Sequence, residues 1–142
     1  MQKLKNIYHL FQAVLANLWY GFPSRKLKVI GVTGTDGKTT TTHLIAHILK
    51  TAGKKVSFIS SVVASGFHVT TPSPFALQKL LKQSTDNNDE YFVLETTSHA
   101  LDQNRVWGIR YEIGIITNIT HEHLDYHGTY EEYLTTKIKL LK

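Results

Sequence analysis

A glycine-rich turn between a strand-like run and a helix-like run is the feature that most constrains this fold. Gly34-Thr35-Asp36-Gly37 follows the apolar run 27–32 and precedes a helix expected over 38–51. Glycine accepts backbone angles that strain other residues, so the chain can leave a strand and enter a helix within a few residues. A strand, a tight turn and a helix in this order predict one unit of an α/β sheet.

The remainder of the chain repeats the alternation of strand and helix. Strands are expected over 27–32, 55–60, 91–94 and 113–117, and helices over 38–51, 73–83 and from Thr129 onward. This alternation predicts a three-layer α/β fold with a mostly parallel sheet. The uninterrupted apolar run 113–117 predicts a strand that is buried on both faces. Four strands are few for such a sheet, and we expect a domain that is truncated at its C-terminal end.

Residues 1–25 are expected to form an N-terminal apolar helix ahead of a domain formed by residues 26–142. Apolar side chains spaced three or four apart predict a helix over 4–20, which Gly21-Phe22-Pro23 ends. This helix either packs on its own domain or makes a weak contact with a membrane surface or a partner. No apolar run reaches the ~18–20 residues of a membrane span.

The charge balance favours an anionic partner. The net charge is +5, from 16 Lys and Arg against 11 Asp and Glu, which suits a nucleotide, a nucleic acid or a membrane surface. No dense basic block with interleaved aromatic residues is present, so we expect no nucleic-acid binding. The absence of cysteine excludes disulfides, thiolate metal sites and cysteine nucleophiles, and it fits a cytoplasmic protein.

The turn and the helix start that follows it have the composition of a phosphate-binding loop. Backbone N–H groups of such a loop point at one anion, and the helix N-terminus adds partial positive charge. Lys38 can reach the β- and γ-phosphates of ATP, and the Thr39 hydroxyl can ligate Mg²⁺. Strict Walker spacing would place glycine at position 32, which is valine, so an ordinary strand-to-helix turn is the alternative. The predicted nucleotide-binding residues are Gly34, Thr35, Asp36, Gly37, Lys38, Thr39 and Thr40.

Three further segments combine polar residues with strand ends or helix starts. They are Thr70-Thr71-Pro72, Glu95 to Leu101 with Gln103 and Arg105 behind it, and Thr117 to Gly128. On the residues alone, the first could be a helix-capping turn and the second a set of surface polar residues. In the third, His121-Glu122-His123 and Asp125 to His127 would suggest zinc, but the spacing fits neither a His-Glu-x-x-His helix nor a common zinc finger.

The loop and these three segments together resemble the Mur ligase family and its folylpolyglutamate synthetase relatives. The resemblance runs from about Lys26 to the C-terminus and is closest to the UDP-N-acetylmuramyl-tripeptide synthetase branch. Asp36 replaces a more common Asn, Thr97 a more common Ser, and Glu122 a more common Asp. The resemblance implies ATP-dependent addition of an amino acid to UDP-MurNAc-dipeptide through an acyl phosphate, in peptidoglycan precursor synthesis.

The resemblance also implies roles for individual residues. Lys38 and two Mg²⁺ ions would stabilise the reacting phosphates, and a carbamoylated Lys137 would supply one metal ligand. A solvated helix lysine is the alternative for Lys137. The implied metal ligands are Thr39, Glu95, His123 and Lys137. The implied contacts to UDP-MurNAc-peptide are Thr70, Thr71, Thr97, Ser98, Gln103 and Arg105.

Two other functions stay open at this point. One is a nucleotide-binding module without ligase activity of its own. The other is a folylpolyglutamate or cyanophycin type of synthetase, against which the segments 70–72 and 123–128 argue. Both alternatives retain a nucleotide bound at the phosphate loop. They differ from the ligase, and from each other, in the second substrate that binds beside the nucleotide.

Overall fold

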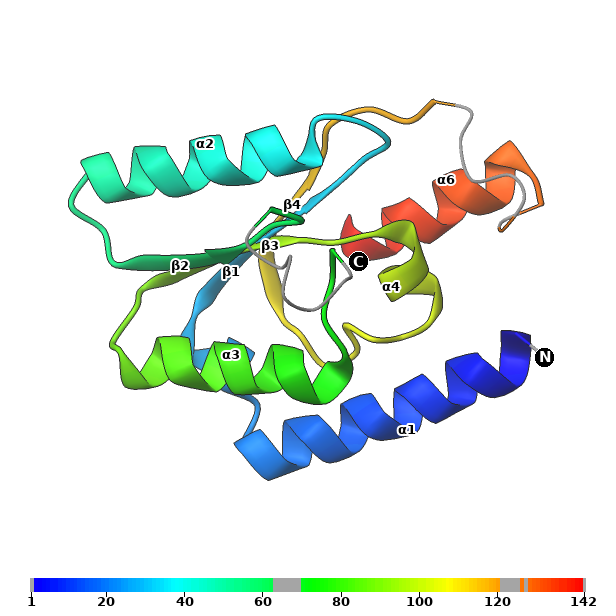
Figure 1. Cartoon of the computed structure of the whole chain (residues 1–142), viewed down its shortest axis with the longest axis horizontal. Coiled ribbons are helices and arrows are strands. Elements are labelled where there is room, and N and C mark those ends of the chain that lie inside the picture. Colours follow the sequence, from blue (N-terminus) through cyan, green and yellow to red (C-terminus); the bar gives the residue numbers. More distant parts are fainter. Residues whose placement is uncertain (1, 63–69, 121–125, 127, 142) are drawn as a thin grey trace.

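The structure is a computed structural model that describes residues 2–62, 70–120, 126 and 128–141 (Figure 1). Its helices and strands alternate along the chain as the sequence predicts. In chain order they are α1 (Gln2–Tyr20), η1 (Pro23–Lys26), β1 (Lys28–Thr33), α2 (Lys38–Thr51), β2 (Val56–Ile59), α3 (Pro74–Asp86), β3 (Tyr91–Glu95), α4 (Ser98–Asp102), β4 (Tyr111–Ile116), α6 (Tyr130–Ile138) and η3 (Lys139–Leu141).

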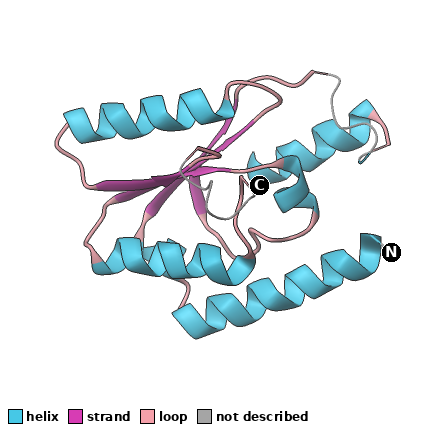
Figure 2. Cartoon of the chain, viewed as in Figure 1, coloured by secondary structure: helices cyan, strands magenta, loops and turns pink. Residues whose placement is uncertain are grey.

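The described strands form one parallel sheet in the order β2-β3-β1-β4. Helix α2 covers one face of the sheet, and α3 covers the other, with α1 outside α3 (Figures 1 and 2). The predicted three-layer α/β fold is therefore confirmed. Since β1 and β3 are neighbours, their carboxyl ends bring Thr33 and Glu95 to the same edge of the sheet. In open α/β sheets this edge is where ligands bind.

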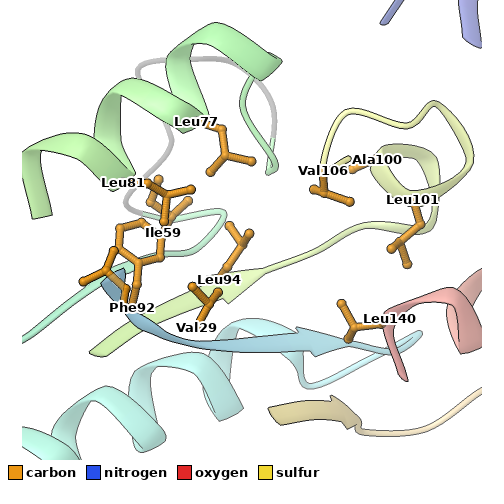
Figure 3. Packing of buried hydrophobic residues seen from close by; sticks show 11 residues of the cluster. Val29, Ile59, Leu77, Leu81, Phe92, Leu94, Ala100, Leu101, Val106 and Leu140 are labelled. Atoms are coloured by element: carbon orange, nitrogen blue, oxygen red, sulfur yellow. The ribbon is translucent and has the colours of Figure 1, made fainter. Parts of the chain in front are cut away.

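Alternating side chains of the central strands build one core on each face of the sheet. Val29, Phe92 and Leu94 pack with Leu77 and Leu81 of α3 (Figure 3). The intervening residues of β1 and β3 pack against α2 on the opposite face. Successive side chains of a strand point to opposite faces, so a strand that is apolar throughout can fill both cores. This is why β1 and β3 read as uninterrupted apolar runs in the sequence.

Strand β4 differs from its prediction. The apolar run was expected to be buried on both faces, but β4 lies at the edge of the described sheet and Ile113 is 48% exposed. Periodicity reports which residues are apolar, whereas the position of a strand in a sheet depends on its neighbours. One side of β4 is nevertheless covered, since Leu140 and Leu141 of η3 approach Gly114.

The helix predicted over 4–20 spans Gln2–Tyr20 and docks on the domain through its small and polar side. Ala13, Ala16 and Asn17 are buried. The Asn17 side chain donates to the Trp107 carbonyl at 2.9 Å. It also lies against Gly108, whose φ is +80° and where any Cβ would come within 2.7 Å of the Asn17 amide. Helix α1 is thus held by close backbone contact.

Two helix starts form as the sequence signals indicate. Ser73 and Pro74 begin α3, with Pro74 in the first turn where its missing N–H is not needed. The Thr129 hydroxyl accepts from the Glu132 N–H at 3.2 Å and caps α6. Helix α4, of five residues, was not predicted. Its signal is Thr97, which caps it by accepting from the Ala100 N–H at 3.1 Å.

Candidate active site

The phosphate loop is built by the connection from β1 to α2. Gly34 and Gly37 both have positive φ angles, +150° and +75°. Gly34 also lies very close to Thr117: a Cβ added at position 34 would come within 1.9 Å of the Thr117 hydroxyl oxygen. No side chain caps the start of α2, where Gly37 occupies the capping position. An uncapped helix N-terminus leaves N–H groups available to an anion.

The segment that follows β4 holds this loop in shape. The Thr35 N–H donates to the Asn118 carbonyl and the Asp36 N–H donates to the Asn118 side chain, both at 2.9 Å. The Thr117 hydroxyl donates to the Asp36 carbonyl at 2.6 Å. These contacts join residues some 80 positions apart in the chain, and Asn118 was not among the predicted site residues. Its position directly after a strand was the available signal.

Lys38 curls back over the loop. Its Nζ donates to the Thr35 carbonyl at 2.6 Å, and the side chain is partly exposed. Asp36 and Thr40 are exposed at the outer side of the loop. The ammonium of Lys38 is therefore held at the loop, where it can approach an incoming phosphate.

Thr39 and Glu95 meet beside the loop. The Thr39 hydroxyl lies 3.0 Å from both carboxylate oxygens of Glu95 and 2.7 Å from the Ser61 hydroxyl. The Ser61 N–H donates to the Glu95 carboxylate at 2.8 Å. Glu95 is only 1% exposed. A buried carboxylate surrounded by hydroxyl groups offers the oxygen donors that Mg²⁺ prefers.

This donor set fits one magnesium ion in part. Thr39 and Glu95, which lie 56 positions apart, are brought together as their predicted roles require. His123, the third predicted ligand, lies outside the described residues. Within the part of the chain that the structure describes, no group of three or more His, Asp or Glu side chains gathers into a metal site. Hydroxyl groups and water would complete the coordination, as is common for Mg²⁺.

Lys137 is buried against the phosphate loop. It is 1% exposed, its Nζ donates to the Gly34 carbonyl at 2.7 Å, and it lies 4.5 Å from the centre of the Tyr133 ring. A solvated surface lysine is thereby ruled out. Lys139, two residues along, is on the surface and lies 3.9 Å from an Asp102 carboxylate oxygen. Helix geometry separates the two lysines because residues two apart point in different directions.

Three predicted substrate residues form one hydrogen-bonded network. The Thr97 N–H donates to the Thr71 hydroxyl at 3.1 Å, and Arg105 donates to the Thr71 carbonyl at 2.8 Å. The Thr71 hydroxyl also reaches the Glu95 carbonyl at 3.2 Å. Arg105 Nε is buried and has no hydrogen-bond partner among the described residues. Burial lowers the pKa of the Arg105 guanidinium, and the nearby Tyr126 opposes that shift.

A cavity of about 300 Å³ unites these groups. It is lined by Gly34, Lys38, Thr70, Thr71, Thr97, Ser98, His99, Arg105, Tyr133 and Lys137. Three of these side chains are lysine or arginine, so the cavity is suited to an anionic ligand. Its unpartnered guanidinium nitrogen could donate to a carboxylate or phosphate oxygen.

Tyr133 and His99 line the cavity and were not singled out from the sequence. Tyr133 is fully buried, and its hydroxyl lies 3.1 Å from the Thr35 hydroxyl. Its signal was its spacing: it precedes Lys137 by four residues, which places both on one face of a helix. The His99 ring packs against the Tyr126 ring, with centroids 4.0 Å apart.

Gln103 contacts Tyr126, outside the network formed by Thr71, Thr97 and Arg105. Its amide donates to the Tyr126 hydroxyl at 3.2 Å, and that hydroxyl donates to Asp102 at 3.0 Å. Burial raises the pKa of Tyr126, and the hydrogen bond from Gln103 opposes that shift. The structure thus groups five of the six predicted substrate residues and places Gln103 beside them.

Fold and site together define a phosphate-binding α/β domain, with a lysine at the helix start and a threonine on a buried glutamate. The family model of the Mur ligase middle domain matches residues 32–142, and the chain belongs to this family. Its relatives include UDP-N-acetylmuramoyl-L-alanyl-D-glutamate–2,6-diaminopimelate ligases. That of Geobacillus thermodenitrificans is 46% identical over 134 residues, which cover 88% of this chain and 27% of the relative. That of Clostridium botulinum is 40% identical, over 92% of this chain and 28% of the relative.

Solved structures agree with this assignment. A structure of a UDP-N-acetylmuramoyl-L-alanyl-D-glutamate–2,6-diaminopimelate ligase matches with a TM-score of 0.69 and 32% identity, over 80% of this chain and 24% of that one. The MurF ligase of Thermotoga maritima in complex with ADP has the same fold, with a TM-score of 0.69 and 24% identity, over 92% of this chain and 29% of that one. The chain therefore spans about a quarter of the length of these relatives.

Proposed function

We propose that this chain supplies the ATP and Mg²⁺ site, and part of the UDP-MurNAc-peptide site, of an ATP-dependent ligase of peptidoglycan precursor synthesis. The observation that carries the proposal is the 300 Å³ cavity, in which the phosphate loop meets Lys38, Arg105 and Lys137. Its binding partners would be UDP-MurNAc-peptide and an amino acid, in the cytoplasm. The relatives named above are 2,6-diaminopimelate ligases, so this amino acid is the first to test.

The proposed reaction forms an amide in two steps. The terminal carboxylate of the peptide attacks the γ-phosphate of ATP, which releases ADP and leaves an acyl phosphate. The amine of the amino acid then attacks the acyl carbon, loses a proton and displaces phosphate. Both partners of the first step are anions, so the site must offset their repulsion before they can meet. Positioning and charge would dominate over general base catalysis.

Different residues of the cavity would bind the nucleotide and the peptide substrate. The N–H groups at the start of α2 and the Lys38 ammonium would bind the β- and γ-phosphates. Arg105, through its free Nε, would bind and orient an anionic group of the peptide substrate. The Thr71 carbonyl accepts a hydrogen bond from Arg105, and Thr97, which is bonded to Thr71, lines the same cavity.

Thr39 and Glu95 would hold one Mg²⁺, which when bound neutralises phosphate charge. Lys137, with His123, is proposed to serve a second metal position as a carbamate. Carbamoylation joins the Lys137 amine to CO₂ and releases a proton, replacing a cation with an oxygen ligand. The carbamate nitrogen keeps one N–H, so its bond to the Gly34 carbonyl could persist.

A nucleotide-binding module without ligase activity of its own is the second candidate. It would need only the loop between β1 and α2 with Lys38, Thr39 and Glu95, which the structure brings together. Both candidates share the phosphate site, so nucleotide binding is the first property to measure.

We predict that the chain binds ATP·Mg²⁺ weakly and that Lys38→Ala lowers the affinity at least tenfold, because one charge-assisted contact to phosphate is lost. Titration calorimetry measures this directly. Lys79→Ala, an exposed lysine on α3, is the matched control and should bind as the wild type does. Equal affinities for wild type and Lys38→Ala would refute the assignment of the phosphate loop.

A further inference from the structure

Helix α1 carries an apolar face that points away from the domain. Six of its large apolar side chains are more than half exposed: Leu4, Ile7, Tyr8, Phe11, Leu18 and Trp19, with Trp19 at 80%. The side that packs on the domain carries the small Ala13 and Ala16 and the polar Asn17. In a helix of a soluble protein the larger apolar residues normally face the core. In α1 the larger apolar residues face away from the core and the small and polar residues face it.

The exposed residues form one continuous stripe. At 3.6 residues per turn they fall within an arc of roughly 120°, with no polar residue inside it. Lys3 and Lys5 lie just beyond its two opposite borders, and both are exposed. Contiguous exposed apolar surface of this kind marks a contact site, whereas scattered single residues do not.

The chain segment that carries the stripe is cationic. Lys3, Lys5, Arg25, Lys26 and Lys28 precede Asp36, the first acidic residue of the chain, and all five are exposed. Carboxylates do lie near the start of α1, on its docked side. Asn6 donates to Asp102 at 3.2 Å, and Asp102, Glu131 and Glu132 line one pocket with Gln2, Lys3 and Asn6. The outward side of this segment is therefore apolar and cationic.

We propose that α1 lies in the surface of an anionic lipid bilayer, with its apolar stripe among the acyl chains and its lysines at the headgroups. Long cationic side chains at the borders of an apolar stripe can extend to lipid phosphates while their stems cover apolar surface. Trp19 and Tyr8 are residue types that favour the interface between lipid and water. The one-sided positive charge is what selects a bilayer over an apolar protein groove, which would not require it.

The helix would lie on the bilayer and not across it. Among the described residues, no helix is both long and apolar enough to span a membrane. Asn17, buried and bonded to Trp107, keeps the opposite side of α1 on the protein. Figure 1 shows α1 as the outermost element on the α3 side, so a bilayer contacting it would not cover the phosphate loop, which lies beyond the sheet. The proposal does not depend on the ligase activity.

Flotation with lipid vesicles tests the proposal. The chain should float with vesicles of phosphatidylglycerol and phosphatidylcholine in equal parts, and at least tenfold less with vesicles of phosphatidylcholine alone. Added salt should reduce the binding, because the attraction of exposed charges is screened. The triple change Leu4→Ser, Phe11→Ser and Leu18→Ser should lower binding at least tenfold. These side chains are exposed, so the fold should be retained, which circular dichroism would verify.

Two further variants separate the apolar and the ionic contributions. Lys3→Gln with Lys5→Gln should weaken binding to the anionic vesicles by roughly fivefold for each lysine. Leu44→Ser with Ile48→Ser removes two comparably exposed apolar residues from α2 and should bind as the wild type does.

The fluorescence of Trp19 reports whether the apolar stripe enters the bilayer. In a Trp107→Phe background, its emission should shift to shorter wavelength when anionic vesicles are added.

Three results would overturn the proposal. The first is a wild-type chain that does not float with anionic vesicles. The second is equal flotation of the wild type and the triple serine variant. The third is a concentration-dependent dimer, seen by analytical ultracentrifugation, that the serine changes abolish while vesicles are not bound. In that last case a second copy of the chain covers the stripe.

Discussion

Glu95 is the residue on which the phosphate site is organised. A carboxylate that is 1% exposed loses most of its hydration, and the Thr39 hydroxyl and the Ser61 N–H only partly replace it. A bound divalent cation would compensate this negative charge. The Thr71 hydroxyl, bonded to the Glu95 carbonyl, connects this carboxylate to the substrate side of the cavity. The proposed metal site and the proposed substrate site are therefore joined through Thr71 and Glu95.

Lys137→Ala is expected to weaken Mg²⁺-dependent ATP binding at least tenfold, because the chain loses a buried group that contacts the phosphate loop and, as a carbamate, an oxygen ligand. Calorimetry over a series of Mg²⁺ concentrations measures the effect. Lys139→Ala, on the exposed side of the same helical segment, should change it by less than a factor of two.

Carbon NMR with ¹³C-bicarbonate can then detect the carbamate itself. A carbamate signal should be present in the wild type and in Lys139→Ala, and absent in Lys137→Ala. A wild-type protein that binds Mg²⁺ normally and shows no carbamate would exclude the carbamate role of Lys137. His123 would then lose its main support as a ligand of the second metal.

Arg105→Lys is expected to weaken binding of UDP-MurNAc-dipeptide at least tenfold and to leave ATP binding within a factor of two. A lysine keeps the charge but lacks the planar set of donors that can bind both the Thr71 carbonyl and an anionic ligand. Separate titrations with each ligand distinguish the two effects. If Arg105→Lys weakened both ligands equally, the arginine would serve to hold the cavity together instead of binding the peptide substrate.

At the scale of elements, helix α3 and the central strands make the larger of the two cores. Leu77 and Leu81 are fully buried against Phe92 and Leu94 (Figure 3). This packing fixes the position of β3, whose carboxyl end carries Glu95. Burial on the α3 side thus determines the position of a polar site at the end of the sheet.

Leu81→Ala is expected to lower the free energy of unfolding by about 2–5 kcal/mol, because it removes a fully buried side chain and leaves a cavity. Leu44→Ala, on the exposed side of α2, should change it by no more than about 0.5 kcal/mol. Urea unfolding followed by circular dichroism gives both values. A similar loss for both variants would show that the core has been placed on the wrong residues.

At the scale of the whole molecule, the chain has the proposed phosphate site on one side and an apolar helix face on another. It spans about a quarter of the length of its ligase relatives. In ligases of this kind the bound ATP, the peptide and the amino acid must be held together in one reaction geometry. The proposed site would hold the first of these and part of the second.

We predict that the chain by itself produces no UDP-MurNAc-tripeptide, with 2,6-diaminopimelate or lysine as the amino acid. The residues described here provide anion-binding groups but leave the incoming amine unpositioned. A phosphate-release assay with ATP, UDP-MurNAc-dipeptide and each amino acid measures this. Turnover that is clearly above the Lys38→Ala background would show that the chain is sufficient for catalysis.

The local order of strands and helices, the glycine turn between β1 and α2 and the family were predictable from the sequence. They depend on short-range patterns: apolar runs for β1 and β3, glycines at Gly34 and Gly37, and Thr129 as a cap. Each of these is determined by backbone geometry within a few residues, so the chain carries the information locally. The proximity of Thr39 and Glu95 was also anticipated, though only through the resemblance to a family.

The tertiary structure alone decided what depends on neighbours distant in the chain. Asn118 supports the loop and Tyr133 reaches Thr35 because parallel strand ends and α6 converge there, which no local pattern reports. The same holds for the edge position of β4. It holds also for α1, whose apolar periodicity predicted a helix but not which side would face the protein. Asn17 and its two alanines dock because they allow close backbone approach, and this leaves the larger apolar residues outside.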